Sequence, residues 1–265
     1  MGQCSATVAL PVVSACGVEC AVLPSAVLSN HTGGFKSWSF CDLTPEMPKI
    51  EAEWRKNGVS FDAFYTGYVC ANQIDPILSI TSSAAKPGAL KFVDPAMADD
   101  GRLYAGFGAD FPREMARLVR VADYALPNFT EAALLLGEKP VLAGYDEAYV
   151  EHVVKGVHAL GAKNVVLTGV SFKPDELGSA VYDGREVVYD FNPRLKRQSH
   201  GTGDVFAACF AGAVMRGLSA AEAAALAADL VCAAIEATPD DHWYGVSFEA
   251  ALPLVVQRLS EAKGA

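Results

Sequence analysis

A regular alternation of strand-like and helix-like segments is the feature that most constrains how this chain can fold. The strand-like segments are FDAFYTGYV at 61–69, LKFVDP at 90–95, YALP at 124–127 and KNVVLTG at 163–169, and helical patterns occupy 112–122 and 146–161 between them. Such alternation is typical of a mostly parallel sheet with helices on both faces. We therefore expect a three-layer α/β/α sandwich.

The remaining segments extend this pattern toward both ends of the chain. A helical pattern covers 6–15, a strand candidate covers 20–28, two strands flank the turn at 183–184, and helices follow from Val205 onward. Thr130 is expected to cap a helix that Gly137 ends. No linker or internal repeat divides the sequence, which favours one domain over residues 1–265. Domains of this class normally open with a strand, so the helix at the start indicates either that the first strand is absent or that the given sequence begins late.

Composition narrows the classes of function. Of the 265 residues 51% are hydrophobic and 20% are charged, so a sizeable core is expected. The net charge of −10 argues against a broad nucleic-acid interface, which needs a basic face, but it is compatible with a small anionic ligand. The seven cysteines are odd in number and form no C-x-x-C pair, which indicates reduced, packed thiols in a cytoplasmic protein.

No segment of the sequence is suited to export or to membrane insertion. The N-terminus lacks a basic region and contains Pro11, unlike a signal peptide. The most apolar long stretch, residues 218–237, carries Glu222, Asp229 and Glu236 seven residues apart, on one stripe of a helix. We expect this amphipathic helix to pack on the core, or at the interface of a homodimer, and not to cross a membrane.

Four polar residues stand where predicted strands end: Tyr68, Asp94, Asn128 and Thr168. In open α/β sheets, ligands bind beyond the carboxyl ends of the strands. We therefore expect these four residues close to the functional site.

The segment HGTGDVFAACFAG at residues 200–212 carries the most specific chemical signal. Gly201 and Gly203 permit close approach to the backbone, and an apolar helical run follows. The free N–H groups and the dipole at the start of that helix suit an anion such as a transferring phosphoryl group. Beside this anion hole, Asp204 is able to take a proton from a substrate hydroxyl as a general base. The alternative is a glycine turn with an aspartate in the first helical turn.

Two shorter motifs carry weaker signals. Asn128 and Glu131 in PNFTEAALL offer oxygen atoms that can orient Mg²⁺ or its waters, although taken alone such a pair is more typical of helix capping. Asp94 in VDPAM is placed for a role near phosphates and metal, or for an ordinary Asp-Pro turn.

The segment SNHTGG brings Asn30, His31 and Thr32 together after a strand candidate. These side chains can hydrogen-bond a ring ligand or form a polar turn. No G-x-S-x-G pattern accompanies His31, so a serine nucleophile has no support. The sequence also lacks G-x-x-x-x-G-K-[ST], which excludes a P-loop enzyme, and no G-x-G-x-x-G follows an early strand, so a dinucleotide site has no sequence support.

Taken in order, these motifs resemble those of the ribokinase-like superfamily. HGTGDVFAACFAG is similar to its carboxy-terminal signature, and residues 4–35 are similar to the amino-terminal region of bacterial pyridoxal (pyridoxine, pyridoxamine) kinases. YTGYV, VDPAM and PNFTEA also fall where those kinases have similar segments. The resemblance covers essentially the whole chain and implies a ribokinase-like fold, with Mg²⁺ and ATP as the other participants in the reaction.

The resemblance also implies a role for each motif residue. Asp204 would deprotonate the 5′-hydroxymethyl group of the substrate. The other implied roles are an anion hole of Gly201, Thr202 and Gly203; contacts to ATP from Thr168, Gly169 and Asn128; Mg²⁺ organised by Asn128, Glu131 and Asp94; and a pyridine pocket lined by Thr32 and Tyr68 with Asn30 and His31 nearby. Arg194, Lys196 and Arg197 match a flexible stretch beside the nucleotide, where they would either screen its charge or form a solvated loop.

The implied activity is ATP-dependent phosphorylation of a B6 vitamer to its 5′-phosphate, for salvage of pyridoxal 5′-phosphate in a cytoplasmic homodimer. One alternative is a hydroxymethylpyrimidine (phosphate) kinase of thiamine synthesis, with the same chemistry on another ring. The other is a catalytically impaired binding module, because in the family the first strand supplies a polar residue to the pyridine pocket. The preferred vitamer and any requirement for a monovalent cation stay open.

Overall fold

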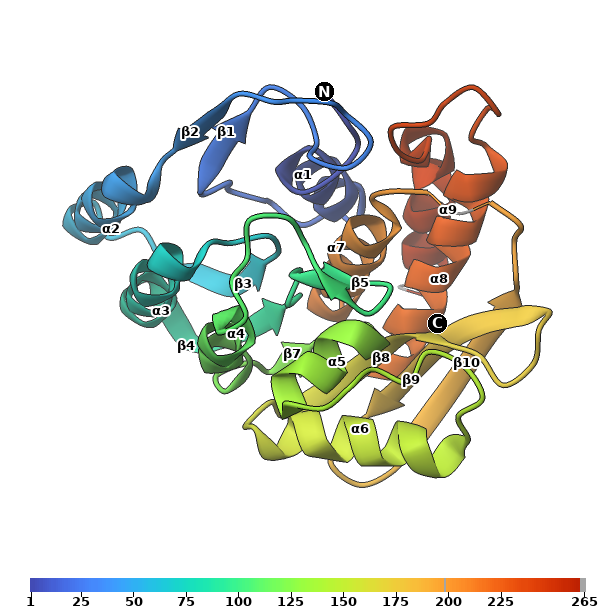
Figure 1. Cartoon of the computed structure of the whole chain (residues 1–265). Helices are drawn as coiled ribbons and strands as arrows, with labels where there is room; N and C mark the ends of the chain where they lie inside the picture. Colours follow the sequence, from blue (N-terminus) through green and yellow to red (C-terminus); the bar gives the residue numbers. More distant parts are fainter. Residues whose placement is uncertain (198, 263–265) are drawn as a thin grey trace. The chain divides into compact units, whose positions relative to one another are not determined.

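The chain divides into two compact units in a computed structural model that describes residues 1–197 and 199–262. The first unit combines Met1–Asp42 with Asp190–Ala265, and the second unit is Leu43–Tyr189. The single domain expected over residues 1–265 stays a prediction. Figure 1 shows the helices and strands of both units.

A six-stranded sheet organises the second unit, apart from the end of its edge strand, whose residues from Asp190 onward belong to the first unit. Its strand order is β10-β9-β8-β7-β4-β3. Strands β3 (Phe61–Thr66), β4 (Ala85–Val93), β7 (Tyr124–Ala125) and β8 (Asn164–Val170) run parallel, whereas β9 (Glu176–Tyr182) is antiparallel to β8, and β10 (Val187–Pro193) lies at the edge. The fold is therefore α/β with a mixed, mostly parallel sheet, and this part of the prediction is confirmed.

Helices of the second unit bury apolar stripes against this sheet. Helix α3 (Ile74–Ser83) packs on β4, while α5 (Phe129–Leu136) and α6 (Glu147–Ala159) pack on β8. In α6 the fully buried residues are Val150, Val153, Val154 and Val157, which share one helical face. The unit also contains α2 (Met47–Lys56), α4 (Phe111–Val119), the short helices η1 (Thr44–Glu46) and η2 (Ala71–Gln73), and a hairpin of β5 (Ala98–Asp99) and β6 (Arg102–Leu103).

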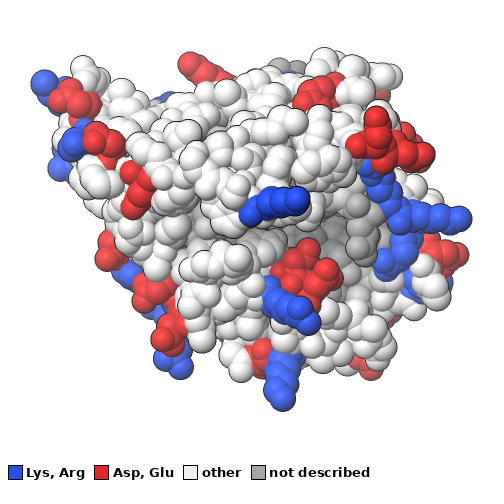
Figure 2. Space-filling model, turned by 45° about the horizontal axis from the view of Figure 1, so that its top comes forward, with Lys and Arg blue, Asp and Glu red and all other residues white. Residues whose placement is uncertain are grey.

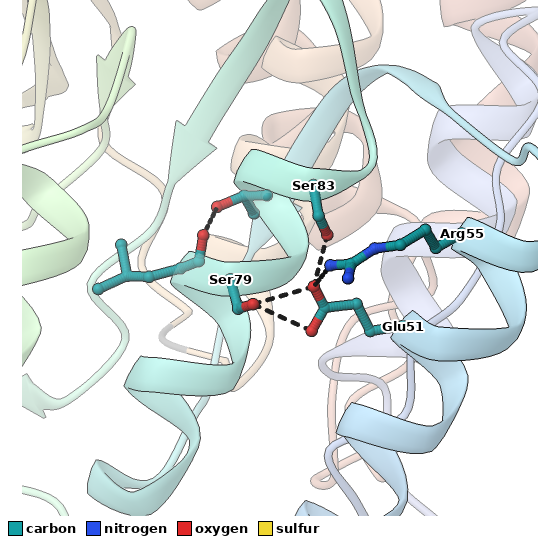
Figure 3. Close-up of polar contacts among 6 residues, drawn as sticks. Glu51, Arg55, Ser79 and Ser83 are labelled. Atoms are coloured by element: carbon teal, nitrogen blue, oxygen red, sulfur yellow. Dashed lines mark hydrogen bonds and ion pairs between the residues drawn. The ribbon is translucent and has the colours of Figure 1, made fainter.

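A polar cluster joins α2 to α3, as Figure 3 shows. Glu51 of α2 accepts hydrogen bonds from Ser83 Oγ at 2.6 Å and from Ser79 Oγ at 2.9 and 3.0 Å, and it pairs with Arg55 Nη2 at 3.0 Å. These donors, with Ser83 the strongest, hold the pKa of Glu51 below its usual range. Neither helix was predicted from the sequence, because both mix polar residues and proline into their apolar stripe.

The first unit is built around helix α7 (Thr202–Met215). Residues Val205–Ala213 of this helix are buried without interruption, because α1 (Ala6–Ala15), α8 (Ala220–Glu236) and α9 (Phe248–Glu261) pack against it. In α8, Ala223, Ala227 and Leu230 are buried, whereas Glu222 and Glu236 are exposed, as the polar stripe predicts. Among the described residues, no helix combines the length and apolar character that a membrane crossing requires.

Two local expectations need correction. The strand expected over 20–28 is limited to β1 (Ala26–Leu28), which pairs with β2 (Phe40–Asp42) in a separate two-stranded antiparallel sheet. The cap of α5 is Asn128 and not Thr130, because the Asn128 side chain accepts the Glu131 N–H, while Thr130 Oγ1 instead accepts the Gly101 N–H at 3.0 Å. Gly137 does end α5, in the left-handed conformation with φ 72°.

Candidate active site

The carboxyl edge of the parallel strands gathers the polar residues that the sequence singles out in the second unit. Asp94 follows β4, Asn128 follows β7, and Thr168 lies in β8; Asn128 and Thr168 are bridged in parallel. The Thr168 N–H donates to the Pro127 carbonyl at 3.0 Å. Tyr68 comes two residues after β3. Because β3, β4, β7 and β8 are consecutive neighbours in the sheet, these four residues lie at one edge of it, and their closeness to the functional site stays a prediction.

Asn128 and Glu131 form a complete capping box at the start of α5. Asn128 Oδ1 accepts the Glu131 N–H at 2.9 Å, and Glu131 Oε2 accepts the Asn128 N–H at 2.9 Å. Glu131 Oε1 accepts the Met97 N–H at 3.1 Å, and Asn128 Nδ2 donates to the Ala98 carbonyl at 2.9 Å. The pair therefore ties the start of α5 to the segment after β4.

These contacts bear directly on the expected magnesium site. Both oxygens of Glu131 already accept backbone N–H groups, and burial raises the pKa of this carboxyl to about 8 against the lowering effect of those hydrogen bonds. Within the described ranges no three His, Cys, Asp or Glu side chains are grouped to hold an ion. The role predicted for Glu131 in organising Mg²⁺ therefore competes with a structural one, and the roles of Asn128 and Asp94 near the metal stay predictions.

Gly169 makes a bulge in β8 beside Thr168. Its φ is 79°, the strand register shifts at this point, and a Cβ would meet no atom within 4 Å. Tyr145 Oη donates to the Gly169 carbonyl at 3.4 Å and accepts the Ser171 N–H at 2.9 Å. The bulge thus leaves open space at the residue predicted to contact ATP. Tyr145 was missed in the sequence because it precedes α6 in a loop without a motif.

Tyr68 belongs to an aromatic stack. Its ring centroid lies 5.2 Å from that of Phe107, which in turn stacks on Phe111 at 4.0 Å. Burial raises the pKa of Tyr68 to about 12, so its hydroxyl stays protonated at neutral pH and can donate a hydrogen bond. Phe107 was not singled out in the sequence, since it lies in the glycine-rich loop before α4.

In the first unit, the GTGD segment starts α7 as expected. Gly201 is the N-cap residue in the left-handed conformation with φ 82°, and the helix begins at Thr202. Gly203 is exposed, and a Cβ there would meet no atom within 4 Å, so a ligand can approach the helix start closely.

The carboxylate of Asp204 lies in the first turn of α7. Burial raises the pKa of Asp204 to about 6, while a hydrogen bond from the Ser5 backbone N–H lowers it. A carboxyl with this pKa is ionised at neutral pH and is a stronger base than an exposed aspartate. The pairing of helix N-terminus and basic carboxylate fits the predicted anion hole and general base.

The SNHTGG loop lies against the residue that precedes GTGD. The ring centroids of His31 and His200 are 5.3 Å apart, and a Cβ at Gly33 would come within 3.1 Å of either ring. Burial lowers the pKa of His31, which is therefore neutral at pH 7. Asn30 Nδ2 fixes the loop by donating to the Ser37 carbonyl at 3.0 Å, and Thr32 is half-buried beside His31. His200 was missed in the sequence, although it is adjacent to GTGD.

Arg197 forms a structural clamp in the first unit. Its Nη1 donates to the carbonyls of Thr238 at 3.0 Å and Pro239 at 2.6 Å, and its Nη2 donates to the His242 carbonyl. These bonds engage the guanidinium with the loop before α9, which explains Arg197 without a nucleotide. Arg194 and Lys196 are exposed, and Gln198 of the same stretch lies outside the described residues.

Comparisons with known proteins place this chain among small-molecule kinases. A phosphomethylpyrimidine kinase family model matches residues 9–245. The thiamine biosynthetic bifunctional enzyme TH1 of Arabidopsis thaliana is 30% identical over 89% of this chain, which spans 47% of that enzyme's length. Pyridoxal kinase PdxY of Leifsonia xyli is 31% identical over 76% of this chain and 72% of its own length. The hydroxymethylpyrimidine/phosphomethylpyrimidine kinase of Rhizobium meliloti is 28% identical, with 86% and 84% covered.

Solved structures extend the likeness over nearly the whole fold. A Bacteroides thetaiotaomicron protein, described as a phosphomethylpyrimidine kinase and crystallised with pyridoxal, is 35% identical with a TM-score of 0.90, over 96% of this chain and 91% of that one. Pyridoxal kinase from Lactobacillus plantarum is 31% identical with a TM-score of 0.89, over 98% and 94%. The chain therefore belongs to the phosphomethylpyrimidine kinase family of ribokinase-like phosphotransferases.

Proposed function

We propose that this protein uses ATP to phosphorylate the 5′-hydroxymethyl group of pyridoxal, pyridoxine or pyridoxamine. The observation that carries the proposal is Asp204, a carboxylate with a raised pKa in the first turn of a helix whose start is open to a ligand. A kinase that acts on an alcohol needs this combination, because the hydroxyl loses its proton as the phosphoryl group arrives.

In this mechanism, the groups at the start of α7 act on the two reacting centres. Asp204 accepts the proton of the substrate hydroxyl as its oxygen attacks the terminal phosphorus of ATP. The backbone N–H groups of Gly201, Thr202 and Gly203 face the negative charge on the transferring phosphoryl group, and they need no reorganisation because the helix fixes them. The products are the 5′-phosphate and ADP, with the proton on Asp204.

In the second unit, the strand edge is proposed to serve the nucleotide. Thr168 and the open bulge at Gly169 are suited to phosphate contacts, and Asn128 stands beside Thr168. Tyr68 is proposed to contact the substrate ring, in the same stack as Phe107. The organisation of Mg²⁺ by Asn128, Glu131 and Asp94 stays a prediction, and no step of this mechanism is assigned to the ion. Homodimer formation also stays a prediction.

The choice of a B6 vitamer over a pyrimidine rests on two observations. The SNHTGG segment resembles that of pyridoxal kinases, and it lies against His200 at the start of the GTGD motif. The 35% identical Bacteroides thetaiotaomicron protein was crystallised with pyridoxal. The second candidate is hydroxymethylpyrimidine (phosphate) kinase activity, favoured by the matching family model and by the Arabidopsis thaliana and Rhizobium meliloti relatives.

An ADP-release assay distinguishes the two candidates. The purified chain is supplied with ATP, magnesium chloride and, in parallel, pyridoxal, pyridoxine, pyridoxamine, hydroxymethylpyrimidine or its phosphate. We expect the highest kcat/KM with one of the B6 vitamers. A higher kcat/KM with either pyrimidine would assign the second function, and binding of a vitamer without ADP release would indicate a binding module.

A further inference from the structure

The bulge in β8 shapes the backbone at Thr168 and Gly169, the two residues of this strand that are proposed to contact ATP. In the pairing with β9, Thr168 lies opposite Ser179 and Val170 lies opposite Gly178. Gly169 therefore has no residue opposite it and is the extra residue of the bulge, with a φ of 79° in the left-handed region. A bulge interrupts the regular ladder, so backbone groups around it take partners from elsewhere in the fold.

The hydroxyl of Tyr145 provides such partners on both sides of Val170. Tyr145 Oη accepts the Ser171 N–H at 2.9 Å and donates to the Gly169 carbonyl at 3.4 Å. The first bond has an ordinary length and the second is long, so the bond to Ser171 is the stronger of the two. One phenolic hydroxyl can donate and accept at the same time, and Tyr145 uses both capacities to hold two backbone groups of the bulge.

The ring of Tyr145 is held in turn by aromatic neighbours. Its centroid lies 4.5 Å from that of Phe129 in a tilted arrangement, and 6.2 Å from that of Phe172 in an edge-on arrangement. Phe129 is buried and directly follows Asn128, the third residue that is proposed to contact ATP. Tyr145 therefore contacts the start of α5 with its ring and the bulge of β8 with its hydroxyl.

The two sides of Thr168 are supported in different ways. Toward α5, the Thr168 N–H donates to the Pro127 carbonyl at 3.0 Å, and Thr168 is bridged to Asn128. On the other side, Gly169 is exposed and a Cβ there would meet no atom within 4 Å, so side-chain packing contributes little to holding its conformation. The hydrogen bonds of Tyr145 act at this less supported side.

We propose that Tyr145 is a positioning residue for the nucleotide: its hydroxyl holds the bulge at Gly169, and with it the backbone beside Thr168, in the conformation that receives the phosphates of ATP. This inference rests on the proposed binding of ATP by Thr168 and Gly169. It adds a residue that acts through the bulge from 24 positions away along the chain.

The first test removes the hydroxyl and keeps the ring. In Tyr145→Phe, we expect the KM for ATP to rise about threefold to tenfold, as loss of one or two neutral hydrogen bonds allows. The Kd of the non-hydrolysable analogue AMP-PCP, measured by calorimetry with magnesium chloride, should rise by the same factor. The KM for pyridoxal should stay within about twofold, a split that a merely structural role would not produce.

Tyr149→Phe is the matched control from the same aromatic cluster. The Tyr149 ring lies 6.0 Å from that of Tyr145, and its Oη accepts the Val141 N–H at 3.3 Å, in the loop between α5 and α6. This variant also loses a tyrosine hydroxyl that accepts a backbone N–H, but the partner is not in or beside β8. It should lower Tm about as much as Tyr145→Phe does and leave the Kd of AMP-PCP unchanged.

A double-mutant cycle tests whether Tyr145 acts through the bulge. Gly169→Ala disturbs the same bulge from the backbone, because a φ of 79° is strained for alanine, and it should raise the Kd of AMP-PCP by itself. If both changes act on one element, Tyr145→Phe should add less to Gly169→Ala than it adds to the wild type. Effects that multiply independently would contradict the proposed route.

Calorimetry requires no turnover, so it separates this inference from the proposed function. If the wild type binds AMP-PCP but releases no ADP with any substrate, the proposed function fails, and Tyr145→Phe still decides the inference. A folded Tyr145→Phe with the wild-type Kd for AMP-PCP would overturn the proposal. An equal loss of affinity in Tyr149→Phe, or a wild type that binds no AMP-PCP, would overturn it as well.

Discussion

Replacing Asp204 by asparagine should weaken activity and strengthen the fold at the same time. Burial raises the pKa of Asp204 from 3.8 to about 6, so the folded protein disfavours the ionised carboxylate that a general base needs. Asparagine is neutral at every pH, has nearly the same shape, and keeps an oxygen that can accept the Ser5 N–H. The substitution therefore removes the cost of burying the charge and the ability to take a proton together.

The size of the gain follows from the shift in pKa. A rise from 3.8 to about 6 is about two units, and at about 1.4 kcal/mol per unit the ionised form destabilises the folded state by roughly 3 kcal/mol. Because the folded pKa lies above the unfolded one, this cost is absent below pH ~4, grows between pH ~4 and ~6, and is complete above. Some of the gain is lost because a neutral acceptor binds the Ser5 N–H less strongly than a carboxylate, so about 1–3 kcal/mol is expected.

Thermal unfolding at several pH values, together with ADP release, measures both effects. At pH 8, Asp204→Asn should raise Tm by several degrees, at about 2–4 °C per kcal/mol for a chain of this size, and the difference should vanish near pH 3.5. Turnover should fall by orders of magnitude. Asp240→Asn, at an exposed aspartate of the same unit, is the control and should change neither quantity. A variant with wild-type Tm at pH 8, or with near-normal turnover, would refute the assignment of a buried base.

Four further substitutions separate structural roles from chemical ones. Glu131→Gln should lower the free energy of unfolding, measured in urea, by about 1–3 kcal/mol, because both Glu131 oxygens accept backbone N–H groups and the new NH₂ must face one of them. A variant with full stability but no activity would favour the metal role alone. Gly201→Ala should lower the free energy of unfolding by more than about 2 kcal/mol, because the new Cβ would collide with Gln3. Gly203→Ala, which has open space around it, should leave Tm unchanged or slightly raised but should lower kcat. Equal kcat in wild type and Gly203→Ala would argue against the anion hole. Arg197→Lys should lower Tm, because lysine lacks the forked guanidinium that binds several carbonyls at once, and it should leave the KM for ATP within about twofold of wild type. A large rise in that KM at constant Tm would instead indicate that Arg197 contacts the nucleotide.

Local patterns predicted most of the secondary structure of this chain correctly. The helix expected over 6–15 is α1, and Asp94, Asn128 and Thr168 lie at one edge of the sheet, although β8 continues two residues beyond Thr168. These features depend on periodicity and on short spacings, which are visible in a window of a few residues. Once strands and helices alternate along the chain, parallel pairing of the four strands β3, β4, β7 and β8 in one sheet is expected.

The contacts that define the candidate site were less visible in the sequence, because they join residues distant along the chain. Gln3 meets Glu249 across 246 positions, and no local spacing indicates it. The cap of α5 is Asn128 instead of the expected Thr130, because the Asn128 side chain can reach the Glu131 N–H. Both residue types are good caps, so sequence preference alone does not decide between them. Likewise, the sequence around Arg197 indicates only an exposed basic residue, because the loop whose carbonyls it binds is distant along the chain.

The most direct test of the proposed function is the identity of the product. Phosphorus-31 NMR follows the wild-type chain with ATP, magnesium chloride and an equimolar mixture of pyridoxal and hydroxymethylpyrimidine, with Asp204→Asn as the blank. The proposed function predicts that a 5′-phosphate of pyridoxal and ADP appear together in equal amounts in the wild type and are lost in the variant. Formation of hydroxymethylpyrimidine phosphate in place of pyridoxal 5′-phosphate, or equal product from Asp204→Asn, would contradict it.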